Sequence, residues 1–258
     1  MRGTFVIFKR ELATYFLSPT FYLITFLVTL LLSVMFTLSL AKFAELSGNQ
    51  MLQMGLSPAQ QNIHYGVFLP HLSLVNLMFI FLIPAFCMRL LAEEKKMHTF
   101  DLLMTSPVKS FDIVLGKFFA TMVVVSCILV VSMVYILIAR RMAEFSWAPT
   151  LTAALGIFLV AGVYVAMDLF ASSLTESALV AFVLSIIFNM GIWFIGALND
   201  SINTPWLKDI FEHISLNTHL AGMIEGTLRT NGLIFLLSLI FLFCFLTERM
   251  IESSRWRS

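Results

Sequence analysis

Charged residues are scarce in this chain. Lysine, arginine, aspartate and glutamate make up 12% of its 258 residues, hydrophobic residues make up 59%, and the mean hydropathy is +0.93. A soluble domain usually carries about 25% charged and about 45–50% apolar residues. A single core of this size could not hide so much apolar surface from water, so the composition predicts a protein embedded in a lipid bilayer.

Cysteine is also rare, and its placement argues against two kinds of site. Cys87, Cys127 and Cys244 all fall inside apolar runs, and no two of them have the short spacing of a zinc or redox motif. We interpret them as small hydrophobic residues that pack between helices. The five histidines are too dispersed to predict a metal cluster. The lysines and arginines do not gather into one basic patch, so no nucleic acid partner is expected.

Motifs that bind phosphate or carry out hydrolysis are missing from the sequence. The nearest candidate for a phosphate-binding loop, Gly116-Lys117, has Phe111 in place of the first glycine and Phe118 in place of the Ser or Thr. The motifs H-E-x-x-H and G-x-S-x-G are absent as well. We therefore expect neither enzyme activity nor a cofactor in this chain, and in particular no ATP hydrolysis.

Long apolar runs are what the chain does have. A helix needs about 20 residues to cross a bilayer core about 30 Å thick, and six runs qualify. They are residues 21–41, 67–88, 118–139, 150–167, 177–198 and 231–247. No cleavage site follows the charged N-terminal segment, so we expect no signal peptide. The predicted fold is an all-α integral membrane protein with a single domain of six transmembrane helices, 1–258.

The distribution of positive charge predicts the orientation. Eleven of the sixteen lysines and arginines fall in the N-terminal segment, the loop between the second and third spans, and the C-terminal tail. Loops rich in lysine and arginine stay on the cytoplasmic side of the membrane. We therefore expect both termini to be cytoplasmic.

The segment before the first span has an amphipathic pattern. Residues 4–17 place Phe5, Phe8, Leu12 and Phe16 on one helical stripe, and Pro19 then interrupts the helix. This pattern predicts a helix that lies in the inner membrane interface. The alternative is a simple extension of the first span, because a proline near a helix start does not exclude it.

Two further connecting segments are more than linkers. Residues 89–117 are the densest charged stretch; Ser106-Pro107 predicts a break in it, and Ser110 can cap a new helix. Such a charge run is usually a solvated cytoplasmic loop, but its apolar and aromatic residues favour a docking element. Residues 199–230 show apolar positions at three- and four-residue steps, which predicts two short extracytoplasmic helices at the outer leaflet before the last span.

Asp168 is the strongest candidate for a charge inside the membrane. Burying a charge in lipid is costly, so such a residue often marks a transport pathway. Asp168 lies near the predicted cytoplasmic end of the fourth span, and the alternative is that its carboxylate simply reaches interfacial water.

Four stretches of the chain resemble motifs of type-2 ABC exporter permeases, most closely those of the gliding-motility-associated branch. They are Lys9-Arg10-Glu11 with Tyr15-Phe16 and Ser18-Pro19; Glu93-Glu94-Lys95-Lys96 with Thr99 to Pro107; Ser172-Ser173-Leu174-Thr175-Glu176; and Glu252-Ser253 with Arg255-Trp256-Arg257. Each motif is weak alone, but the four occur in order and cover nearly the whole chain. The chain departs from the branch at Asp168 and at Asn231, where a small or apolar residue and an acidic residue are usual.

The resemblance implies a permease subunit of the bacterial inner membrane. Such permeases work as pairs, with a second copy or a different permease, beside a dimer of ABC ATPase subunits that bind ATP and Mg. An extracytoplasmic auxiliary protein can complete the assembly. The residues expected to transmit force from the ATPase are Glu93, Glu94, Lys95, Thr99, Phe100, Asp101, Ser173 and Glu176. Asp168 is the candidate for a pathway residue, and the substrate is not specified.

Two other functions remain open at this point. In the first, the chain is an anchor or mechanotransmission subunit through which the ATPase drives an extracytoplasmic partner, and nothing crosses the bilayer. In the second it is a secondary transporter, which the sequence disfavours because it lacks paired intramembrane charges and matched broken helices.

Overall fold

The computed structural model describes residues 2–48, 62–97, 108–139, 146–198 and 205–255. Every regular element among these residues is a helix, and six helices are long and apolar enough to cross a membrane. They correspond to α2 (Pro19–Gly48), α4 (Leu69–Cys87), α7 (Ser110–Ala139), α8 (Trp147–Ser173), α9 (Ala178–Leu198) and α12 (Thr230–Arg255). The predicted all-α fold with six spans is confirmed.

Several of these helices run beyond the predicted spans. α2 continues past residue 41 to Gly48, α12 continues past residue 247 to Arg255, and α7 begins at Ser110 instead of residue 118. Apolar runs mark only the part of a helix that can lie in lipid, whereas the backbone hydrogen bonds continue through the polar residues at each end.

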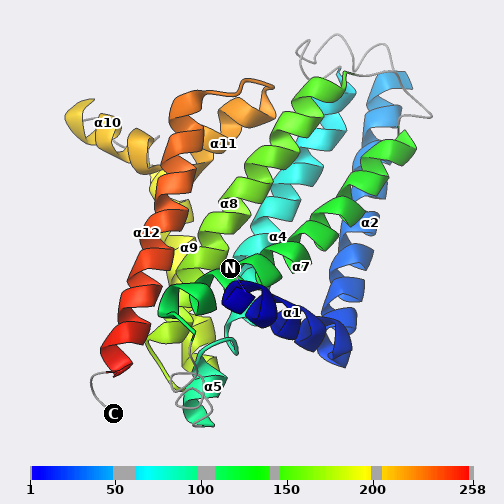
Figure 1. The fold of residues 1–258 in the computed structure, drawn as a ribbon. Coiled ribbons are helices and arrows are strands. Elements are labelled where there is room, and N and C mark those ends of the chain that lie inside the picture. Colours follow the sequence, from blue (N-terminus) through cyan, green and yellow to red (C-terminus); the bar gives the residue numbers. More distant parts are fainter. Residues whose placement is uncertain (1, 49–61, 98–107, 140–145, 199–204, 256–258) are drawn as a thin grey trace.

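α8 is the central helix of the bundle. It packs against α4, α7, α9, α12 and the short helix α11 (Leu216–Ile224), and most of its residues are buried. Gly156 of α8 lies so close to α11 that an added Cβ would come within 2.9 Å of the Met223 sulfur. Helices in lipid associate by close packing at small residues, which accounts for a glycine there. α2 lies at the edge of the bundle with most of its surface exposed (Figure 1).

Short helices flank the spans at both ends. α5 (Ala92–Lys96) and the C-terminal end of α12 lie at one end, and α10 (Pro205–Ile214) and α11 lie at the other (Figure 1). The two short helices predicted before the last span are therefore present. A π-helical turn, η1 (His64–Phe68), leads into α4.

The N-terminal helix α1 (Arg2–Leu17) is separate from the first span. The chain turns at Ser18, whose N–H donates to the Tyr15 carbonyl, and Pro19 then opens α2. α1 runs across the spans rather than along them (Figure 1). The alternative of a continuous extension of the first span is wrong, because the proline falls at a true break.

Candidate functional site

α1 packs against the first turns of α7 through a face that the apolar stripe did not predict. Ile7 and Glu11 are buried, whereas Phe5 and Phe16 are exposed. Two of the four stripe residues, Phe5 and Phe16, are therefore exposed, whereas Phe8 and Leu12 are partly buried. An exposed aromatic face suits a helix in contact with lipid, but the location of α1 in the inner membrane interface stays a prediction.

The close approach of α1 to α7 depends on Gly116. A Cβ at this position would lie 2.8 Å from Ile7 Cγ2, closer than real Cβ atoms come, and 3.0 Å from the Thr4 carbonyl oxygen, tighter than most real Cβ contacts. One turn earlier on α7, the Asp112 carboxylate accepts a hydrogen bond from the Thr4 hydroxyl at 2.5 Å. The start of α7 thus holds α1 by both shape and polar contact.

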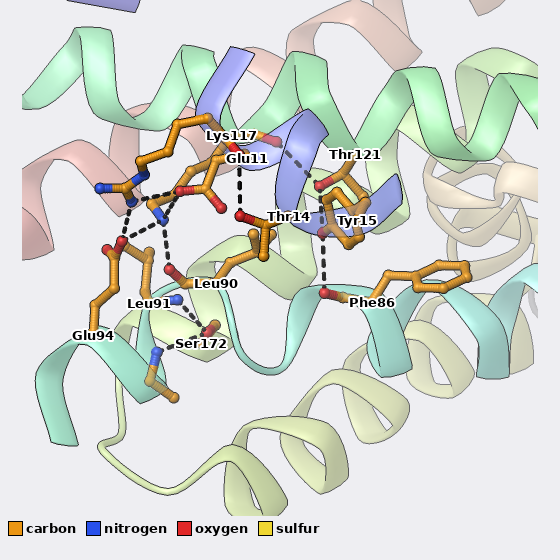
Figure 2. A network of polar contacts seen from close by, with 12 residues as sticks. Glu11, Thr14, Tyr15, Phe86, Leu90, Leu91, Glu94, Lys117, Thr121 and Ser172 are labelled. Atoms are coloured by element: carbon orange, nitrogen blue, oxygen red, sulfur yellow. Dashed lines mark hydrogen bonds and ion pairs between the residues drawn. The ribbon is translucent and has the colours of Figure 1, made fainter. Parts of the chain in front are cut away.

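Lys117, the residue after this glycine, is the centre of a buried ion cluster. Its side chain is 1% exposed. The ammonium donates to Glu11 Oε1 at 2.9 Å and to the Leu90 carbonyl at 2.7 Å, and it lies 3.1 Å from Glu94 Oε1 (Figure 2). The ammonium, which has three N–H donors, thus lies within 3.1 Å of three oxygen atoms, one each from α1, α5 and the turn between α4 and α5.

Arg10 completes the cluster and balances its charge. Its Nη2 lies 2.6 Å from Glu11 Oε1 and also contacts Glu94 Oε1, so two cations face two carboxylates. Burial by itself raises the pKa of Glu11, but Lys117 and Arg10 outweigh this effect and the net pKa lies below the usual value. A carboxyl whose pKa is lower in the folded than in the unfolded protein stabilises the fold at pH above its unfolded-state pKa. This contribution is lost as the pH falls through the folded-state pKa. At neutral pH the carboxylate is charged and the cluster is intact.

Tyr15 ties α1 to the end of α4. Its hydroxyl donates to the Phe86 carbonyl at 3.0 Å and lies 3.1 Å from Thr121 Oγ1 of α7 (Figure 2). The last carbonyls of a helix have no partner within it, so Phe86 and, further on, Leu90 use side-chain donors instead. Two helices, α1 and α7, therefore supply side-chain donors to carbonyls at the end of α4 and in the turn that follows it.

Ser172 of α8 organises the start of α5. Its Oγ accepts hydrogen bonds from the Leu91 and Ala92 amides, each at 3.2 Å, and donates to the Met88 carbonyl at 3.3 Å. The side chain is fully buried. We define the α4–α5 junction as residues 86–94 together with Glu11, Tyr15, Lys117 and Ser172, since these four side chains determine its shape.

Replacing Ser172 with Ala should loosen this junction. The Leu91 and Ala92 amides would lose their acceptor, and a buried donor without a partner costs about 1–3 kcal/mol. We expect faster amide hydrogen exchange at residues 91–96 in the purified protein. The same change at Ser253, whose exposed hydroxyl returns to its own helix, is the control. Unchanged exchange at α5 would show that Ser172 does not hold the junction.

The predicted coupling residues fall into two groups. Lys95 points inward, donating to the Ser173 carbonyl at 2.5 Å, and Glu94 belongs to the ion cluster. Ser173 is buried and its hydroxyl donates a hydrogen bond to the Phe170 carbonyl, whereas Glu176 is exposed. Glu93 is partly exposed and pairs with Arg89 at 3.3 Å. Thr99, Phe100 and Asp101 lie outside the residues that the structure describes.

Asp168 lies deeper than the sequence suggested. α8 continues to Ser173, and Asp168 has no exposed surface, so the alternative that its carboxylate simply reaches interfacial water is wrong. The Asn189 amide of α9 donates to its Oδ2 at 3.4 Å. It does not line the cavity between α1 and the α4–α5 junction or the one between α4, α9 and α11. Its role in a transport pathway stays a prediction.

Four residues of the junction were not among the predicted site residues. Lys117 was interpreted as a loop cation, but it lies two turns inside α7. Glu11, Tyr15 and Ser172 enter the sequence argument only as parts of the family motifs. The spacing of Thr4, Ile7, Glu11 and Tyr15 on one helical face could have identified them as the docking side of α1.

The comparison with known families covers the whole junction. Residues 2–228 match the family described as ABC-2 type transporter. No curated protein matches the chain. Within the described part of the chain, no three His, Cys, Asp or Glu residues are grouped to hold a metal ion.

Proposed function

The chain belongs to the ABC-2 type transporter family, and from this premise we propose that it couples ATP hydrolysis in a separate ABC ATPase subunit to export across the bacterial inner membrane. Membership makes it an integral membrane permease subunit that is not itself an ATPase. The proposed assembly pairs two permeases, whether identical or different, with a dimer of ATPase subunits, and both termini face the cytoplasm.

The observation that carries the proposal is the buried ion cluster at the α4–α5 junction. Lys117 joins α1 and α5 to α7 through Glu11 and Glu94, and Ser172 joins α5 to α8. A displacement of α5 would therefore move α7 and α8 together, because packed and hydrogen-bonded helices transmit strain rather than absorb it. In this proposal Glu94 and Lys95 transmit force inside the protein and do not touch the ATPase.

In this proposal the ATPase contacts the exposed residues at the end of the bundle where α5 lies. Met97 follows α5 and is 70% exposed, Lys96 is exposed beside it, and Glu176 is exposed in the turn between α8 and α9. Exposed large apolar side chains next to charges are common in protein interfaces. Thr99, Phe100 and Asp101 continue the chain from this point and belong to the same proposed contact.

Replacing Met97 with Asp should uncouple the complex without unfolding the permease. The change places a charge in the proposed contact, and a desolvated unpaired charge can cost 2–5 kcal/mol or more, about a 30-fold or larger loss of affinity. ATPase stimulation and co-purification of the ATPase subunit measure the effect.

The matched control is Leu228→Asp, which introduces the same charge at an exposed site before α12, at the other end of the bundle. Normal stimulation by the Met97 variant, or equal loss in both variants, would contradict the assigned contact. The melting temperature of each variant shows whether the permease itself remains folded.

A second candidate function is mechanotransmission to an extracytoplasmic partner. The observation that favours it is α10, which projects from the bundle at the end opposite α5 (Figure 1). Its Trp206 side chain is exposed. Exposed tryptophans are enriched in interface hot spots. Under this candidate, Trp206→Ala abolishes the partner's activity while ATP-driven transport into vesicles is absent in every variant.

A further inference from the structure

A cavity of about 550 Å³ lies between α1, the start of α2 and the α4–α5 junction. This volume is typical of a site for a small organic ligand. Its floor is apolar, formed by Phe21, Ile24, Ala85 and Phe86. Its rim is polar and charged, and the exposure of the charged side chains indicates what it can bind.

The charged residues of the cavity differ in how far they are covered. The side chains of Glu11 and Glu94 are 9% and 16% exposed, and both carboxylates are paired within the ion cluster. Arg10, Arg89 and Glu93 keep 50%, 59% and 44% of their side chains exposed. The rim therefore offers the exposed part of Arg10, which also contacts the ion cluster, and the exposed Arg89–Glu93 ion pair, beside an apolar floor.

A zwitterionic amphiphile matches this arrangement. The two arginines suit a phosphate, because guanidinium groups form paired hydrogen bonds with phosphate oxygens. Glu93 suits a primary ammonium, which can donate hydrogen bonds to a carboxylate. Together with Lys117, which contacts Glu11 and Glu94, the charged groups around the cavity carry no net charge, which suits a head group without net charge.

The position of the cavity fits a lipid of the bilayer. The cavity lies where α2 begins and α4 ends, and α1 lines it with Arg10, Glu11, Thr14 and Tyr15. Apolar side chains at such a helix end lie at the depth of the acyl chains, and charged ones lie at the depth of the head groups. Phe21 and Ile24 would contact the upper acyl chain.

We propose that this cavity binds one phospholipid of the adjacent leaflet with an ethanolamine head group, its phosphate between Arg10 and Arg89 and its ammonium on Glu93. The lipid would fill the space between α1 and the α4–α5 junction. This site is independent of the proposed coupling function, since it requires only the folded permease.

Native mass spectrometry of the full-length purified chain can test the site. The delipidated protein is mixed with equal amounts of phosphatidylethanolamine, phosphatidylcholine and phosphatidylglycerol of the same chains. We expect one phosphatidylethanolamine to be retained about five-fold or more over either competitor, because only it offers both a phosphate and a primary ammonium. Equal retention of the three lipids, which indicates annular lipid only, or preference for phosphatidylglycerol would overturn the proposal.

Two variants locate the site. Glu93→Gln should remove the preference for ethanolamine over choline, whereas Ile24→Trp should reduce retention of all three lipids by filling the floor. Glu45→Gln, an exposed glutamate near the far end of α2, is the matched control and should keep the preference. If Ile24→Trp does not fold, Glu93→Gln alone tests the proposal. An unchanged preference of this variant for ethanolamine over choline would overturn it. ATPase measurements play no part in the test, so its failure would leave the coupling proposal standing.

Discussion

Replacing Lys117 with Met should destabilise the protein more than any other single substitution of a charged residue at the α4–α5 junction. Met has nearly the length of lysine but no charge, so Glu11 Oε1 and Glu94 Oε1, each within 3.1 Å of the missing ammonium, would face one another with only Arg10 between them. Removing one partner of a buried ion pair costs about 3–5 kcal/mol, because it leaves uncompensated buried charge. Equilibrium unfolding of the purified protein measures the loss.

Lys96→Met is the matched control, because Lys96 is an exposed lysine of α5 and its loss should change stability by no more than about 0.5 kcal/mol. The double variant Lys117→Met with Glu11→Gln should recover part of the loss, since it removes one of the two stranded charges. If the two lysine variants are equally stable, Lys117 is not the centre of the junction. A double variant less stable than Lys117→Met would show that Glu11 contributes through contacts other than charge.

Hydropathy predicted the architecture because lipid constrains a membrane helix strongly. Each of the six apolar runs became a spanning helix, and the periodic segment before the last span became α10 and α11. The ends were less predictable, since helices such as α12 continue into polar sequence where hydropathy no longer reports on structure. The sequence also left open whether the helix breaks at Ser18, because a proline can either begin a helix or interrupt one.

The docking face of α1 could not be predicted by the same rule. In water the apolar stripe of a helix turns inward, but in a membrane it can turn to lipid while a polar face packs on the protein. Glu11 is buried on that face because Lys117 is buried opposite it, and the two lie 106 positions apart in the sequence. Hydropathy along one segment contains no information about such a pair.

Three of the four stretches that carried the family resemblance meet at the junction. Arg10, Glu11 and Tyr15 come from the first, Glu94 from the second and Ser172 from the third, and the residues around Lys117 connect them (Figure 2). A motif that is weak alone becomes informative when its polar residues form hydrogen bonds or ion pairs with residues of another motif. The fourth stretch, at the end of α12, lies outside the junction, and Glu252 there pairs with Arg249 of its own helix.

Replacing Gly116 with Val should detach α1 while leaving the six spans packed. The new Cβ would meet Ile7 Cβ at 2.9 Å and the Thr4 carbonyl at 3.0 Å; neither atom is the flexible end of a side chain, so α1 itself must move. Overpacking of this kind costs about 1–3 kcal/mol. The movement would also break the contacts of Thr4 with Asp112 and of Glu11 with Lys117.

A disulfide between introduced cysteines at Thr4 and Asp112 reports directly on docking, because these side chains are in contact in the structure. It should form readily in the otherwise unchanged chain and at least about ten-fold more slowly with Gly116→Val, since a displacement of α1 carries the two positions apart. Gly191→Val is the matched control: a Cβ at Gly191 meets nothing within 4 Å, and cross-linking should be normal. Normal cross-linking in the Gly116 variant would mean that α1 adapts without undocking. Loss of cross-linking with an unchanged melting temperature of the protein would establish that α1 is attached to the bundle separately from the packing of the six spans, which the coupling role requires.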